Sequence, residues 1–171
     1  MIKFKSPHLL RALDIAFTGN HSLLIITNDI EFIKKIISKL QTCPENPKYF
    51  PPEKLYIDKP CPCRNFNNTN RMCKCMPEEI RKWQMNLPQT NMTIIVNDFP
   101  FEYLEFDKSN IEKEGLNFLE TVYKTKGMLP FELEATLKVA KTISEMDKED
   151  KIKAMHIAEA LQYVLGKEFY L

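Results

Sequence analysis

The chain has 171 residues, of which 44% are hydrophobic and 11% aromatic. Such a chain can bury a hydrophobic core, which excludes a disordered protein and predicts one compact domain, or a core domain with a small appendage. Because 24 basic side chains balance 23 acidic ones to leave a formal charge of +1, the net charge indicates neither a nucleic-acid nor a membrane partner.

Helical and extended patterns alternate over the first hundred residues. Ser6 and Pro7 can begin the first helix as its cap and its first residue, and Asn28 or Asp29 can cap the second. A proline-rich connector over 43–54 cannot form regular structure. In chain order, the patterns predict a helix over about 7–17, a strand over 22–27, a helix to about 41, a short strand over 54–58, a helix from Pro77 and a strand over 92–99.

From Asp107 onward the pattern is purely helical and predicts three helices. Ser109 and Glu112 match a capping box that would begin the first of them, and Pro130 would begin the second. Strands that alternate with helices favour a parallel sheet. We therefore predict an α/β fold, with a small parallel sheet core of two or three layers over 1–105 and a C-terminal helical subdomain over 106–171.

Four of the five cysteines lie in the stretch PCPCRNFNNTNRMCKC, as two C-x-C pairs separated by nine residues. We call residues 59–76 the cysteine module. Two such pairs can fold back to supply the four tetrahedral ligands of a structural zinc ion, which leaves no open position for catalysis. Metal would also order the asparagine-rich interior of the module. The sequence thus predicts a structural zinc site and no catalytic residues; the predicted ligands are Cys61, Cys63, Cys73 and Cys75.

Two alternatives remain open for these cysteines, namely free thiols in a loop, and disulfides or redox use. The first residues, MIKFKSPHLLRALDIAF, lack the apolar stretch of a signal peptide, and no segment approaches the roughly 18 apolar residues of a membrane helix. We therefore expect a cytoplasmic protein without a membrane partner. In that reducing compartment, metal binding is favoured over structural disulfides.

The cysteine module is also locally basic, because it contains lysine and arginine side chains and no acidic residue. Its cations could contact nucleic acid or another anion, and one aromatic ring could stack on a base. These candidate contacts are Lys59, Arg64, Phe66, Arg71 and Lys74. The alternative is that they are ordinary surface residues, or contacts to a protein partner.

Three segments resemble, in chain order, the magnesium-chelatase-like AAA+ ATPases, especially their bacterial competence-associated branch. ALDIAFTGNHSLLII is similar to the opening of that family, and PCPCRNFNNTNRMCKCMPEEIRKW is similar to its cysteine insertion and the following helix. TLKVAKTISEMDKEDKIKAMHIAEALQY is similar to its C-terminal helical lid. The resemblance implies that 1–105 is a reduced AAA+ core with a cysteine insertion at 59–76, and that 106–171 is a lid-like subdomain.

The nucleotide-handling motifs of that family are not found. The phosphate-binding loop G-x-x-x-x-G-K-[ST] is replaced by TNDIEFIKKIISKL, which contains no glycine and has Ile33 where the lysine belongs. Lys34 and Lys35 are the adjacent cations. No acidic Walker B pair is found. The segment NLPQTNMTIIVN falls where the family has an arginine that contacts a neighbour's nucleotide, and it contains no arginine. The family's lid would supply a second arginine, and Phe131 stands at that position.

We therefore predict a non-catalytic relative of these ATPases that serves as an interaction or assembly module, through a protein partner or self-association. A second hypothesis is direct DNA or RNA binding through the basic cysteine module. A third is residual ATP binding or hydrolysis, with Lys34 or Lys35 in place of the lost lysine, although the missing motifs argue against ATP as a cofactor.

Overall fold

The computed structural model describes residues 2–45, 47–48, 50–51, 53–68 and 71–166. The chain divides into two units, one formed by Phe4–Tyr103 and the other by Met1–Lys3 with Leu104–Leu171. We call them the α/β unit and the helical unit. Residues 69–70 of the predicted cysteine insertion, and 167–171 of the predicted helical subdomain, lie outside the described residues.

A three-stranded sheet with the order β3-β2-β4 forms the centre of the α/β unit. The central strand β2 (Leu23–Thr27) pairs with β3 (Leu55–Asp58) on one side and with β4 (Met92–Val96) on the other. Helix α2 (Ile30–Gln41) connects β2 to β3, and α3 (Pro77–Met85) lies between β3 and β4. Both pairings are parallel, as such helical crossovers require, so the predicted α/β class with a small parallel sheet is confirmed.

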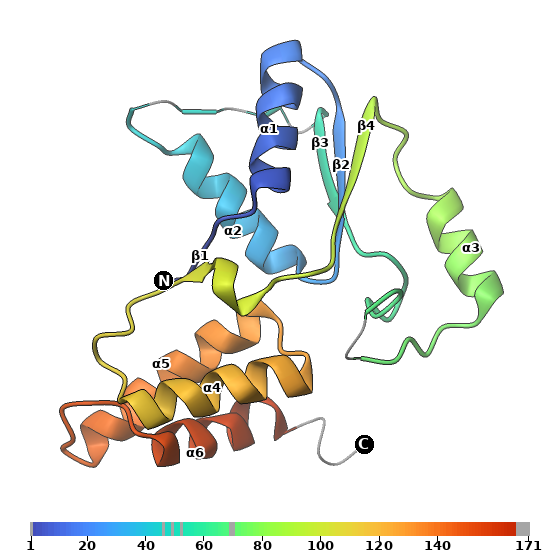
Figure 1. Cartoon of the computed structure of the whole chain (residues 1–171). Coiled ribbons are helices and arrows are strands. Elements are labelled where there is room, and N and C mark those ends of the chain that lie inside the picture. Colours follow the sequence, from blue (N-terminus) through green and yellow to red (C-terminus); the bar gives the residue numbers. More distant parts are fainter. Residues whose placement is uncertain (1, 46, 49, 52, 69–70, 167–171) are drawn as a thin grey trace. The chain divides into compact units, whose positions relative to one another are not determined.

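The hydrophobic core of this unit lies on one face of the sheet. Figure 1 shows α1 (Pro7–Gly19) and α2 on one side of the three strands and α3 on the other. The side chains buried between α1, α2 and the sheet include Leu9, Leu13, Phe32, Ile33, Ile94 and Val96. Because successive strand residues point to opposite faces, Ile95 points away from this core and is 61% exposed. The second face of the sheet is therefore only partly covered.

The caps of the first two helices are those that the sequence predicts. The Ser6 hydroxyl accepts a hydrogen bond from the Leu9 N–H, and the Asp29 carboxylate accepts one from the Phe32 N–H. The first helix runs two residues beyond its predicted end because Asn20 closes it in a left-handed conformation, with φ of 52°.

The helical unit contains, among its described residues, the three predicted helices α4 (Lys113–Lys126), α5 (Pro130–Met146) and α6 (Ala154–Val164). Helix α6 packs against both α4 and α5 (Figure 1). Side chains with no exposed surface from all three helices form this second core: Leu119, Leu133, Ala140, Ile157 and Ala160. The short strands β1 (Lys3–Phe4) and β5 (Leu104–Glu105) pair with each other.

The predicted capping box at Ser109 and Glu112 is wrong. The Ser109 hydroxyl donates to Asp107 at 2.6 Å instead, and α4 begins at Lys113. The intervening residues form a parallel bridge between Ile111 and Ile152, in which the Glu112 N–H donates to the Ile152 carbonyl. A backbone pairing between residues so far apart in sequence is invisible to a local helical pattern, and it displaces the start of the helix.

This bridge brings the start of α4 close to the backbone before α6, and Gly115 lies at the contact. A Cβ atom at Gly115 would lie 3.2 Å from both the Ile152 carbonyl oxygen and the Ala154 nitrogen. We expect Gly115→Val to destabilise the protein by about 1–3 kcal/mol, as overpacking does, measured as a lower urea midpoint. Gly166→Val is the matched control, because no atom of the described residues beyond its chain neighbours lies within 4 Å of a Cβ atom there; equal midpoints for the two variants would contradict the tight contact.

Candidate metal centre

The four cysteines of the cysteine module converge on one point. Their ligand atoms all lie within 4.8 Å of one another, although two residues of the module are outside the described part. The Sγ atoms of Cys61 and Cys63 are 3.5 Å apart, those of Cys61 and Cys73 are 3.8 Å apart, and those of Cys63 and Cys73 are 3.5 Å apart. Cys75 joins the group through its Sγ atom, which accepts a hydrogen bond from the Cys63 N–H. All four are free thiols, so the disulfide alternative is not what the structure shows.

These separations match a tetrahedral metal site. Zinc–sulfur bonds of about 2.3 Å place neighbouring sulfurs of a tetrahedron about 3.8 Å apart, whereas a disulfide needs about 2.05 Å. Cys61 has no exposed surface, and the other three cysteines are half-buried. The cluster can therefore hold a metal ion with all four coordination positions filled by protein, which is a structural rather than a catalytic site.

Two regular elements hold the cysteine module at its ends. The module follows directly on β3, whose last residue Asp58 accepts a hydrogen bond from the Lys59 N–H, and it leads into α3 at Pro77. The Met76 N–H donates to the Glu79 carboxylate at 2.7 Å, which fixes the entry into the helix. Within the first clip, the Arg64 N–H donates to the Cys61 carbonyl and Arg64 takes φ of 71°, so the chain turns sharply around the sulfurs.

Trp83 of α3 packs against the cysteine module. Its indole N–H donates to the Lys59 carbonyl at 2.8 Å, and the Lys59 ammonium lies 4.8 Å from the centroid of the indole ring. The same ammonium donates to the Pro62 carbonyl at 3.0 Å. Lys59 thus connects the module to α3 through a cation–π contact and one hydrogen bond, while its bond to Pro62 stays within the module.

Interactions within the cluster move the thiol pKa values apart. Burial by itself raises the pKa of Cys63, but hydrogen bonds from the backbone N–H groups of Asn65 and Lys74, and from neighbouring thiols, lower it to about 6. Burial together with the neighbouring sulfurs raises the pKa of Cys75 to about 12. The Cys75 N–H lowers the pKa of Cys73, but burial and the neighbouring sulfurs outweigh it and raise that pKa. Since metal binds thiolates, it must displace protons from Cys73 and Cys75 at neutral pH, and its affinity should rise with pH.

The predicted anion contacts differ in their exposure. Arg64 and Lys74 are exposed beside the cluster, whereas Arg71 is half-buried. Lys59 is engaged with the indole ring of α3. Phe66 is half-buried and lines a hollow on the far side of the sheet from the core. Two of the predicted cations, Arg64 and Lys74, are therefore exposed.

The region that the resemblance assigns to the phosphate-binding loop has a different structure. The turn from β2 to α2 consists of two residues, and the buried Asp29 carboxylate accepts the Phe32 N–H at the N-terminus of the helix. Ile33 is completely buried in the core. Lys34 and Lys35 lie on the exposed side of α2, where Lys34 is 3.9 Å from a glutamate one turn earlier. A carboxylate thus occupies the helix N-terminus that would attract a phosphate.

Comparison with known protein families finds a match for the helical unit. Residues 102–164 match the family model described as magnesium chelatase, subunit ChlI C-terminal. The helical unit is therefore similar to a magnesium-chelatase C-terminal domain. The predicted resemblance to the magnesium-chelatase-like family is thereby confirmed, while its competence-associated branch and the reduced AAA+ core stay predictions. No curated protein and no solved structure matches the chain, and among the described residues no helix is long and apolar enough to cross a membrane.

The fifth cysteine provides a control for the metal site. We expect wild-type protein, purified without chelator, to hold one metal ion per chain by native mass spectrometry, and the double variant with Cys73→Ser and Cys75→Ser to hold none. Two thiolates remain in that variant, too few for a closed site. Cys43→Ser should retain the metal, because Cys43 lies outside the cluster. Equal metal content in all three proteins would contradict the assignment of the ligands.

Proposed function

We propose that this protein is a non-catalytic assembly module, in which a metal-stabilised cysteine module presents a contact surface to a protein partner or to a second copy of the chain. The observation that carries the proposal is the convergence of four thiols within 4.8 Å. With four protein ligands the ion is enclosed, so its contribution is to fold the module, which contains little regular structure of its own.

The absence of ATPase motifs from the sequence supports a non-catalytic role. A nucleotide needs backbone N–H groups and a lysine around its phosphates. The segment TNDIEFIKKIISKL supplies no glycine for such a loop, and its Asp29 carboxylate already satisfies the first turn of α2. Negative charge at this helix N-terminus opposes a second anion, which is why we propose a scaffold that has lost nucleotide hydrolysis.

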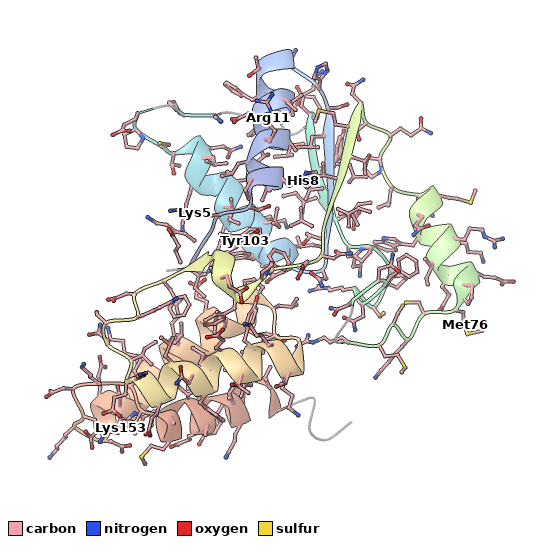
Figure 2. All side chains as sticks on the ribbon, in the orientation of Figure 1. Lys5, His8, Arg11, Met76, Tyr103 and Lys153 are labelled. Atoms are coloured by element: carbon pink, nitrogen blue, oxygen red, sulfur yellow. The ribbon has the colours of Figure 1, made fainter. Side chains whose placement is uncertain are left out.

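Exposed methionines mark the contact surface that we propose. Met72 and Met76 lie on either side of the last two cysteines and are 85% and 66% exposed. Figure 2 shows Met76 at the start of α3. Methionine is flexible and polarisable, and it is common on surfaces that bind protein partners. Two exposed thioethers on a metal-ordered loop therefore favour a protein partner over an empty surface.

Sedimentation velocity over a range of protein concentrations tests this function. We expect concentration-dependent self-association that weakens when Met72→Ser and Met76→Ser are combined, and that weakens likewise when a chelator removes the metal. Met146→Ser is the matched control, since Met146 is 76% exposed but lies on α5 of the helical unit. A monomer at every concentration, or equal weakening in the double variant and in Met146→Ser, would overturn self-association through this surface.

Nucleic-acid binding is the second candidate function, and the exposed cations Arg64 and Lys74 favour it. A divalent ion with four thiolates carries a net charge of about −2, so part of the basic charge of the module would only balance its own metal centre. The positive charge left to attract a nucleic acid is therefore small, so we favour protein assembly over nucleic-acid binding.

Arg64→Gly tests nucleic-acid binding without damage to the fold. Arg64 has φ of 71°, a conformation that glycine adopts without strain, so the variant loses the charge while the turn is kept. If the module binds single-stranded DNA, the affinity should fall severalfold in Arg64→Gly, and the slope of affinity against salt should decrease by about one ion. Unchanged affinity and salt dependence, measured by fluorescence anisotropy, would remove this candidate.

A further inference from the structure

A hollow of about 360 Å³ lies on the partly covered face of the sheet in the α/β unit. Ile26, the fourth residue of β2, and Ile95 of β4 form its floor, and Pro60 and Phe66 of the cysteine module with Leu87 after α3 form its walls. Ile26 and Ile95 are the penultimate residues of their strands, and Pro60 lies two residues beyond the end of β3, so the hollow adjoins the carboxyl ends of the parallel strands. Ligands of open α/β sheets bind outside those ends, in concave and largely apolar sites of comparable volume.

Two asparagines directly follow the two strands beneath this hollow. Asn28 comes after β2, and Asn97 comes after β4 and lines the hollow. The Asn28 side-chain N–H donates to the Asn97 carbonyl at 3.3 Å, which fixes the backbone at this position. The side-chain oxygens of both residues are buried and, within the described part of the chain, accept no hydrogen bond. Since buried acceptors are normally paired, the Asn97 amide has hydrogen-bonding capacity that its described protein neighbours do not use, and Asn97 lines the hollow.

The lining of the hollow specifies the chemistry of that ligand. Among the described residues that line it, none carries a charge, and the polar groups are the side-chain amides of Asn67, Gln84 and Asn97. An anion such as a phosphate would find no cation here. The half-buried ring of Phe66 offers a face for stacking, and an asparagine amide pairs with the adjacent donor and acceptor on the edge of a base.

We propose that this hollow binds an uncharged planar heteroaromatic group of the nucleobase kind, with its face against Phe66 and its edge on the Asn97 amide. The inference goes beyond the assembly role and does not depend on it, since neither Met72 nor Met76 lines the hollow. The group can belong to a free nucleoside or to a base of a single strand, because both present the same ring and edge.

Ligand-detected NMR separates these two sources. Wild-type protein purified without chelator is mixed with adenosine or cytidine, and in parallel with a short single-stranded oligonucleotide and its abasic counterpart. We expect saturation transfer to the ring protons of a nucleoside, or binding of the oligonucleotide that its abasic counterpart lacks. The first result identifies a small-molecule site and the second a base within a strand. No transfer at low millimolar nucleoside together with equal binding of both oligonucleotides would overturn the proposal.

Two variants and a matched control locate the site. Ile95→Lys fills the hollow from an exposed position, and Asn97→Leu removes the amide at similar volume; each should weaken binding by about tenfold or more, the loss typical of one stacking or base-edge contact. Thr93→Lys adds the same charge on the same face of β4, two residues away and outside the hollow, and should bind as the wild type does. Far-UV circular dichroism confirms folding of each variant. Equal binding by all three would place the ligand elsewhere and overturn the proposal.

Discussion

The close approach of four thiols is the constraint on which the cysteine module depends. Sulfur atoms 3.5 to 3.8 Å apart repel one another once they become thiolates, and the raised pKa values of Cys73 and Cys75 express that repulsion together with burial. A bound divalent cation offsets both the repulsion between the thiolates and the cost of burying their charge. The chain around the cluster contributes one-residue clips, a left-handed turn at Arg64 and N–H groups that point at sulfur, which are local devices for holding the ligands rather than a hydrophobic core.

The cysteine module is connected to the sheet and to α3 of the α/β unit. The first C-x-C pair follows β3, and α3 follows the second pair. The contact between Lys59 and Trp83 joins the start of the module to α3. On the core face, α1 and α2 bury apolar side chains of the strands. On the opposite face, the cysteine module and α3 leave a hollow whose floor includes the exposed Ile95. The same module thus closes the metal centre and forms walls of a neutral cavity, and the two features are chemically distinct.

The helical unit has its own core and its own close contact. The bridge between Ile111 and Ile152 ties the start of α4 to the start of α6, and glycine at position 115 permits the two backbones to approach. His156 of α6 accepts a hydrogen bond from the Lys153 N–H and so caps the helix from a position that is 1% exposed. None of these contacts involves a residue of the cysteine module.

The sequence by itself determined the features that depend on neighbours along the chain. Ser6 and Asp29 cap their helices, the alternation of helix and strand fixes a parallel sheet, and the C-x-C spacing brings the sulfurs together in clips, because each of these rests on a few adjacent residues. The tertiary structure alone decided that Lys59 lies against Trp83, that Ser109 does not cap α4, and that Asn97, whose side-chain oxygen is buried and unpaired among the described residues, lines a hollow. Those outcomes depend on which distant segments become neighbours, and no local pattern of residue types contains that information.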